Sequence, residues 1–160
     1  MADQPGVLSR GWITFLSKLP RVAKALSKLQ VLVYRLSSGR IASTFQGFPI
    51  CLVTMAGRSA GREITLPLMY VPHGEAILLV ASFGGASRHP AWYRNLVANP
   101  TVFIRVNGRR LKMRARQAES AEKALLWPLC VASYPEFSTY QKRTNRDIPV
   151  MVCEKLHAET

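Results

Sequence analysis

The sequence predicts a mainly β domain with short helices, an α+β fold whose six strands form a mostly antiparallel sheet. Two observations lead to this expectation. Short apolar runs rich in β-branched residues recur from residue 48 onward, and such runs are typical of strands. Turns or short helices separate these runs, and strands joined by turns pair antiparallel. A sheet of this kind can close into a small barrel.

Six segments have the character of strands, and turn residues bound most of them. They are residues 48–55, 63–71, 75–82, 101–106, 109–117 and 148–154. Between the fourth and the fifth lies Asn107-Gly108, the dipeptide most typical of a two-residue hairpin turn. Pro67 cannot donate a hydrogen bond to a neighbouring strand, so it predicts an edge position or a bulge in the second segment.

Helices are expected in four places. They span residues 21–36, 91–99, 120 to about 126, and 134 to about 143. Pro90 would occupy the first position of the second helix, where its missing N–H group is not needed. Ser120 is expected to cap the third helix. Pro128 would bend or end that helix, because it removes a hydrogen bond and crowds the preceding turn.

The composition is that of a folded, strongly basic protein. The chain has 160 residues, of which 48% are hydrophobic, and its net charge is +13. We therefore expect an anionic partner: nucleic acid, an acidic membrane surface or a polyanionic small ligand. Residues 1–47 carry seven Lys or Arg and one acid, a net charge of +6. The expected organisation is a basic helical segment, 1–47, followed by a cofactor-binding domain, 48–157.

The helix expected at residues 21–36 has one basic and one apolar face. At about 100° per residue, the basic side chains gather on one side, namely Arg21, Lys24, Lys28 and Arg35. The apolar side chains gather opposite them, namely Val22, Leu26, Leu29, Val33 and Leu36. The helix could pack on the domain with a solvated cationic face, or it could also contact anionic lipid through residues 1–40. Trp12, Phe15 and Leu16 could add an interfacial anchor.

The cysteines and histidines indicate neither a disulfide framework nor a metal site. Cys51, Cys130 and Cys153 lie far apart in apolar stretches, so we expect small buried side chains in a reducing compartment. No histidine has metal-ligand spacing to a cysteine or carboxylate. No apolar run reaches the length of a membrane span, and the N-terminus lacks a signal-peptide pattern. A cytoplasmic protein is expected, one that can be peripheral on the inner face of the cell membrane.

Three segments could build a binding site for an organic cofactor. The loop 57–62 brackets Arg58 with glycines that permit a backbone anion nest, although it could be an ordinary hairpin loop. The segment 81–85 pairs the Ser82 hydroxyl with two glycines that allow a flat ring to approach, although it could be a flexible turn. The helix start at 89–95 offers N–H groups to a phosphate, although its Trp and Tyr could be core residues.

A fourth candidate feature is aromatic. Tyr134, Phe137 and Tyr140 recur every three residues, so they would cover one broad face of a helix. That face could cover an apolar substrate pocket, or it could pack in the core. The arginines on one face of strand 109–117 could bind nucleic acid, but no aromatic-interleaved RNA-binding motif accompanies them, so no nucleic-acid partner is expected.

In order along the chain, these segments resemble the deazaflavin-dependent nitroreductase family over about residues 31–154. Residues 32–62, LVYRLSSGRIASTFQGFPICLVTMAGRSAGR, resemble the helix, linker and first strand-loop of that family. The most specific stretch is 81–102, ASFGGASRHPAWYRNLVANPTV. The last is 134–154, YPEFSTYQKRTNRDIPVMVCE. The resemblance implies a split β-barrel like those of flavin reductases and pyridoxamine oxidases, with the N-terminal and short helices packed outside it.

The resemblance also implies an activity. Coenzyme F420, an 8-hydroxy-5-deazaflavin, would be the cofactor, with FMN the less expected alternative. An oxidoreductase of this nitroreductase or quinone reductase type would pass hydride from the reduced cofactor to a quinone, a nitroaromatic or a related unsaturated acceptor. The alternative is a non-catalytic split barrel that binds a flavin, heme or lipid. A monomer or weak dimer is expected.

The family's functional positions carry over to named residues of this chain. The catalytic positions would be Ser82, Tyr134 and Tyr140, the two tyrosines falling with Phe137 on the substrate wall. The cofactor contacts would be Arg58, Ser59, Ala60, Ile64, Thr65, Leu66, Pro67, Leu68, Met69, Val80, Ala81, Ser82, Phe83, Ala91, Trp92, Tyr93, Arg94, Asn95 and Phe137. Ser59, Ile64 and Phe83 stand where the family commonly has basic or polar residues, so weaker binding of the anionic cofactor tail is expected.

Overall fold

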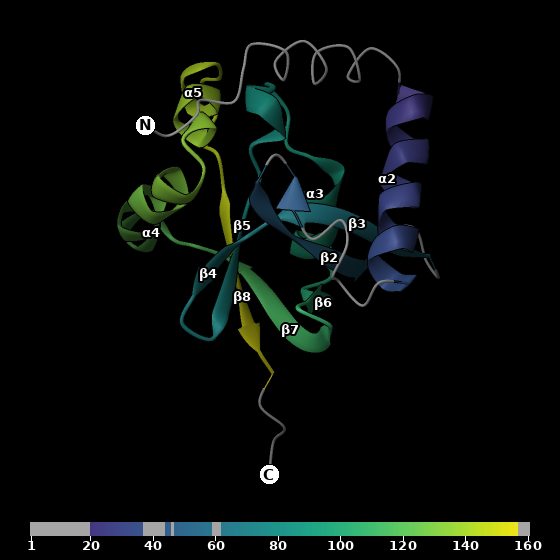
Figure 1. Ribbon diagram of the computed structural model, residues 1–160. Coiled ribbons are helices and arrows are strands. Elements are labelled where there is room, and N and C mark those ends of the chain that lie inside the picture. The colour runs from purple at the N-terminus through teal and green to yellow at the C-terminus, as the bar shows by residue number, and fades with distance from the viewer. Residues whose placement is uncertain (1–19, 37–43, 46, 59–61, 157–160) are drawn as a thin grey trace, which may run out of the picture.

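A strongly twisted antiparallel sheet with helices on its outside forms the described part of the chain (Figure 1). The computed structural model describes residues 20–36, 44–45, 47–58 and 62–156. The elements in chain order are α2 (Pro20–Leu36), β1 (Thr44–Phe45), β2 (Phe48–Ala56), β3 (Glu63–Met69), β4 (Val71–His73), β5 (Ala76–Val80), the 3-10 turn η1 (Phe83–Gly85), α3 (Ala91–Ala98), β6 (Thr101–Val106), β7 (Arg109–Gln117), α4 (Ser120–Ser133), α5 (Glu136–Lys142) and β8 (Val150–Lys155).

All six predicted strands are present, but the described residues form eight strands rather than six. The predicted strand 63–71 is divided at Tyr70 into β3 and β4, and the two-residue β1 was not predicted. Strand order in the sheet is β1-β2-β6-β7-β8-β5-β4. β3 lies outside this order and pairs with β2. Every described pair is antiparallel, as the turn connections predicted.

The extended segment 63–73 belongs to two ladders. Its first part, β3, pairs with β2, and its last part, β4, pairs with β5. Only Tyr70 separates the two parts, so the chain itself joins the ends of a hydrogen-bonded sheet that does not close. The result is a split barrel. β3 pairs with no described strand other than β2, so Pro67 lies in an edge strand, as predicted.

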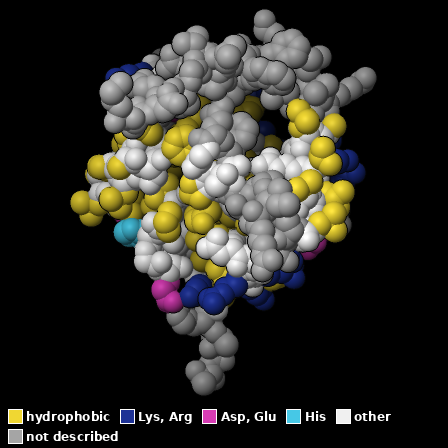
Figure 2. Space-filling model, in the orientation of Figure 1, with side chains coloured by type: hydrophobic (Ala, Val, Ile, Leu, Met, Phe, Trp, Pro, Cys, Tyr) yellow, Lys and Arg dark blue, Asp and Glu magenta, His cyan; other side chains and the backbone are white. Residues whose placement is uncertain are grey.

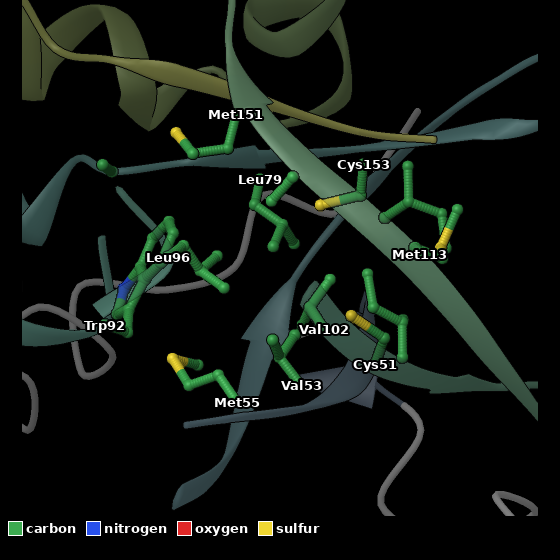
Figure 3. Packing of buried hydrophobic residues seen from close by; sticks show 14 residues of the cluster. Cys51, Val53, Met55, Leu79, Trp92, Leu96, Val102, Met113, Met151 and Cys153 are labelled. Carbon is green, nitrogen blue, oxygen red and sulfur yellow. The ribbon is translucent and has the colours of Figure 1, made fainter. Parts of the chain in front are cut away.

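The interior of the barrel is a continuous apolar core. Figure 3 shows side chains from the strands converging, including Val53, Leu79 and Met113. Trp92 and Leu96 reach into the same cluster from α3, which packs against β2 and β7. All three cysteines are free and buried, as expected. A second apolar cluster lies where α4 and α5 cover β5 and β8.

α4 continues seven residues beyond its predicted end. It runs through Pro128 to Ser133. Proline leaves the carbonyl four residues earlier without a partner, and that residue, Ala124, is exposed to solvent. Leu126 and Cys130 are buried on either side of the proline and hold the helix on the second cluster. The prediction that Ser120 caps this helix was wrong, because Glu119 occupies the cap position. Pro90 likewise caps α3 rather than opening it.

α2 lies on the opposite side of the barrel from α4 and α5 (Figure 1). It packs on β3, and its Tyr34 is only 1% exposed and donates a hydrogen bond of 3.2 Å to the carbonyl of Arg105. The cationic side chains of Lys24, Lys28 and Arg35 are exposed, as expected. Most of the described apolar face does not pack on the domain, however. Its exposed leucines are Leu26, Leu29 and Leu36, between 46% and 77% exposed.

We predict that the barrel interior dominates stability. Replacing Leu79, which is fully buried, by alanine should lower the free energy of unfolding by about 2–5 kcal/mol, because the substitution loses apolar contacts and leaves a cavity. Leu125 is 76% exposed, and Leu125→Ala should change the same quantity by no more than about 0.5 kcal/mol. Urea unfolding followed by circular dichroism measures both. Equal losses in the two variants would contradict this account of the core.

Candidate active site

The loop after β5 is fixed by one side chain, Arg146. Its Nη2 donates hydrogen bonds to the carbonyls of Ala81 and Ser82, at 3.0 and 2.7 Å, and its Nε donates to the carbonyl of Ala86 at 2.8 Å. Guanidinium offers several donors in a rigid plane, so one arginine can hold three carbonyls at once. Burial lowers the pKa of Arg146, which nevertheless stays charged near neutral pH. The loop 81–86 is therefore tied to the segment that precedes β8.

Three consecutive residues of this loop are left-handed. Their φ angles are 48° at Phe83, 64° at Gly84 and 79° at Gly85. The conformation is unfavourable for Phe83, which carries a Cβ, and strain of this kind persists only where the surroundings enforce it. At Gly85 a side chain has no room, since a Cβ would lie 2.6 Å from the carbonyl oxygen of Tyr140. Gly85 thus lets the loop lie against α5.

The turn leaves main-chain donors available. The N–H groups of Gly85 and Ala86 donate to the carbonyls of Ser82 and Phe83, at 3.0 and 3.1 Å. The N–H groups of Phe83 and Gly84 have no partner among the described backbone groups. Successive N–H groups in left-handed backbone form a concave anion-binding surface. Together with the half-buried Ser82, they can donate hydrogen bonds to carbonyl or anionic oxygens of a ligand.

His89 completes the contacts of Arg146. Arg146 Nη1 lies 3.2 Å from His89 Nδ1, and because arginine only donates, Nδ1 must accept and the ring must be neutral. Burial, then the charges of Arg146 and Arg94, lower the pKa of His89. Its ring lies 4.6 Å from that of Tyr93, whose hydroxyl donates to Gln117 at 2.6 Å. His89 therefore helps to hold Arg146 in place.

An aromatic cluster lies next to the loop. The rings of Tyr134 and Phe137 are 5.0 Å apart, and the hydroxyls of Tyr134 and Tyr140 are 3.4 Å apart. Tyr134 is not in the predicted helix but in extended backbone between α4 and α5; the ring contacts still bring the three side chains together. Burial, followed by the hydrogen bond with Tyr140, raises the pKa of Tyr134. Its hydroxyl therefore stays protonated and can donate.

A small apolar cavity, about 20 Å³ in volume, opens beside these rings. Predicted cofactor contacts and the predicted substrate wall meet at this cavity, because Met69 of β3, Val80 of β5, Tyr134 and Phe137 all line it. Ser82 and Phe83 lie two and three residues after Val80 in the chain, and η1 packs against α5. Cavity, loop and aromatic cluster thus form one neighbourhood, which we call the candidate active site.

Other predicted contacts point elsewhere. Side chains alternate across a strand, so Ile64, Leu66 and Leu68 pack against the barrel core. Thr65 lies on the outer face beneath α2, where its hydroxyl is 2.9 Å from that of Thr54 and accepts from Arg35 at 3.1 Å. One ligand cannot meet all these side chains. A continuous run of contacts along β3 would have to use the unpaired backbone edge of this strand.

The predicted contacts in the other two segments also separate. Ala81 and Trp92 are buried in the barrel core and Asn95 is buried in α3, whereas Ala91 and Arg94 are exposed. Arg58 is exposed in the loop after β2, where the N–H of Gly57 donates to the carbonyl of Arg62 at 2.7 Å. Ser59 and Ala60 lie outside the described residues.

Basic side chains surround the candidate active site. The Arg88 guanidinium lies 5.6 Å from the centre of the Phe83 ring, and that of Arg143 lies 5.5 Å from the Tyr140 ring. Arg88 thus brings a cation next to Phe83, a position where the family resemblance implies a basic or polar residue.

Arg146 was not among the residues that the sequence predicted for the site. It stands in the polar segment TNRDI ahead of an apolar strand, which resembles any solvated loop. Gln141 was not among them either, although its side chain donates to the carbonyl of Arg146 at 2.8 Å and accepts from the N–H of Ile148 at 2.9 Å. The quoted stretch 134–154 contains both residues, but no local signal marks Arg146 as the partner of a loop about 60 residues earlier, or Gln141 as the residue that holds the Arg146 segment.

The described residues include no cluster of three or more metal-ligating side chains. Within the same residues, no helix combines the length and the apolar character needed to span a bilayer.

The chain is similar to known proteins over most of its length. The family model of F420H(2)-dependent quinone reductases matches residues 26–155. An F420H(2)-dependent quinone reductase of Mycobacterium tuberculosis is 37% identical over 135 residues, which cover 82% of this chain and 91% of that protein.

Solved structures agree as well. The structure of an F420-H2 dependent reductase has 40% identity and a TM-score of 0.63, covering 66% of this chain and 94% of the other. The heme storage protein HutZ of Vibrio cholerae has 14% identity and a TM-score of 0.51 over 68% of this chain and 82% of its own, and shares the fold alone. The resemblance drawn from the sequence is confirmed: the chain belongs to the F420H(2)-dependent quinone reductase family.

Proposed function

We propose that this protein is an oxidoreductase that reduces quinones with reduced coenzyme F420. The observation that carries the proposal is the family match over residues 26–155, which includes every element of the candidate active site. Nitroaromatic and related unsaturated compounds are further acceptors of the same chemical class, since they also take up hydride at an electron-poor π-system.

The candidate active site fits a flat cofactor with an anionic tail. The N–H groups of Phe83 and Gly84 have no described backbone partner, and Arg58 and Arg88 are exposed cations near the two glycine loops. Ser82, the η1 backbone and the free edge of β3 would hold the polar rim of the ring. When bound, reduced F420 supplies the hydride.

The residues of the chain position the reactants rather than react themselves. Burial raises the pKa of the Cys130 thiol to about 11 and that of Cys153 to about 12. Cys51 is shifted in the same direction by burial. Thiols that stay protonated are poor nucleophiles. Catalysis would then rest on holding donor and acceptor within about 3–3.5 Å of each other.

Two tyrosines are suited to the acceptor side. A quinone that takes up hydride becomes more negative at oxygen, and a nearby O–H donor stabilises that charge. Tyr134 has a raised pKa and is paired with Tyr140, so one hydroxyl of the pair donates to the other and the remaining proton can point to the acceptor. Phe137 packs against both rings and would support the apolar body of the quinone.

We further propose that α2 brings the protein to an anionic membrane surface, where apolar quinones dissolve. Figure 2 shows hydrophobic side chains on the surface of α2, and four of its leucines are exposed. Lys24 and Lys28 are exposed on the same helix. Exposed apolar and basic side chains on one helix are typical of helices that lie in the membrane interface.

We predict that Ser82→Ala lowers the rate of F420H2-dependent menadione reduction by about fivefold while activity remains measurable, because one hydrogen bond of about 1 kcal/mol is lost. Loss of F420H2 absorbance reports the rate. A native protein that binds F420 but reduces no quinone would contradict the proposed function. Complete loss of activity in Ser82→Ala, with binding and fold intact, would contradict a supporting role for Ser82.

Arg146→Ala should weaken F420 binding by at least about tenfold, since three carbonyls lose their donor and the left-handed turn relaxes. Guanidinium ion added at millimolar concentration should restore part of the affinity. Fluorescence titration of F420 measures both effects. The matched control is Arg143→Ala, which removes a neighbouring cation but no hydrogen bond to the loop. If both variants lose the same F420 affinity and guanidinium ion restores none of it, Arg146 contributes only its charge and does not position the loop.

Binding to vesicles tests the proposed role of α2. Lys24→Gln/Lys28→Gln should lower the partition coefficient onto phosphatidylglycerol vesicles by about tenfold or more, because each basic residue near such a surface contributes about 1 kcal/mol. Pelleting at low and high salt measures it. Arg114→Gln/Lys142→Gln removes two charges elsewhere and should have a much smaller effect. Equal binding of native protein and the α2 variant would rule out this contact.

A further inference from the structure

A groove is lined by residues of α2 and of the strands β2, β3, β6 and β7. In Figure 1, α2 lies on the other side of the barrel from α4 and α5. The volume of the groove is about 400 Å³. The residues that line it are Arg35, Leu52, Thr54, Glu63, Phe103, Arg105 and Arg110. None of them belongs to the loop or the aromatic cluster of the candidate active site, so this groove has no part in the proposed hydride transfer.

Three guanidinium groups face this groove, and neutral groups orient two of them. Arg110 lies over the Phe103 ring, 4.0 Å from its centre. Arg35 donates a 3.1 Å hydrogen bond to the hydroxyl of Thr65. Arg105 is the direct cross-strand partner of Arg110 in the ladder of β6 and β7, so these two side chains leave the sheet on the same face.

The charges in the groove are not balanced by the described residues. None of the three arginines forms an ion pair with a described carboxylate, and Glu63 is the single acid among the lining residues. Like charges directly opposite each other in a ladder are destabilising. An anion placed between them would relieve that repulsion, and the planar donors of guanidinium match the oxygens of a phosphate group.

The surroundings of the groove indicate which phosphate. Arg35 is followed by Leu36, which is 77% exposed, and Leu29 and Leu32 of the same helix are more than half exposed. A ligand with a phosphate head and an apolar chain would meet both features. We infer that the groove binds the phosphate of an anionic lipid headgroup, with the acyl chains along α2. This inference builds on the proposed membrane contact of α2 and adds to it a defined headgroup site.

The probe is dihexanoyl-phosphatidylglycerol below its critical micelle concentration, titrated into the full chain and followed by backbone amide NMR. Resonances of β6 and β7 should shift. Arg105→Gln/Arg110→Gln should raise the dissociation constant at least about tenfold, because two charge-assisted contacts are lost. Arg109→Gln/Arg114→Gln removes the same charge from β7 outside the groove and should change it by no more than about twofold.

The double variant Arg105→Lys/Arg110→Lys tests whether charge alone accounts for binding. It keeps both charges but loses the planar donors, so its affinity should also fall. Menadione reduction by the groove variants should equal that of the native protein, which confirms their fold. No binding of the lipid probe, or equal losses in the Arg105/Arg110 and Arg109/Arg114 variants, would overturn the site.

Two further comparisons distinguish a lipid from a free phosphate as the ligand, and the groove site from the membrane contact of α2. Glycerol 3-phosphate should bind at least about tenfold more weakly than the lipid probe, since it lacks the chains that bury apolar surface on α2. Equal affinity would overturn the lipid assignment. If the lipid probe fails to shift β6 and β7 while Lys24→Gln/Lys28→Gln still weakens vesicle binding, the groove site is wrong and the membrane contact of α2 stands.

Discussion

One extended segment, residues 63–73, belongs to two ladders, and much of the described architecture follows from it. The segment pairs with β2 before Tyr70 and with β5 after it, so the sheet curls around an apolar interior. It also leaves one edge of β3 without a strand partner among the described residues. That edge ends at Met69, which lines the cavity next to Tyr134. The curl of the open sheet and the unpaired edge of β3 therefore have the same cause.

The candidate active site lies where the barrel meets its helical layer. The loop 81–86 leaves β5, the strand that packs on both apolar clusters. Arg146 fixes the loop by three carbonyls, and Gly85 lets it approach α5. A strained turn kept in place by a charged side chain is a preorganised donor set, because the cost of ordering it is met during folding.

The basic charge of the chain serves two sides of the molecule. Arg88, Arg143 and Arg146 gather around the candidate active site, whereas Arg35, Arg105 and Arg110 gather at the groove beneath α2. Arg116 is different, because Glu122 and Glu154 both pair with it and join α4 to β7 and β8. Arginines that contribute to the net charge of +13 thus lie at three places: beside the proposed site of an anionic cofactor, in the groove proposed to bind lipid, and at the attachment of α4 to the sheet.

The sequence by itself determined the six strand segments it predicted, the Asn107-Gly108 turn, the buried cysteines and the family. These features depend on local periodicity, turn chemistry and motif order. The tertiary structure alone decided that the side chains of β3 alternate between the barrel core and the outer face beneath α2. It also decided that α4 continues beyond Pro128 and that Tyr134 lies between α4 and α5. It decided as well that the leucines of α2 stay exposed and that Arg146 meets a loop about 60 residues away. Local sequence carries no record of which distant surface a helix face or a guanidinium will meet, since that depends on how the whole barrel packs.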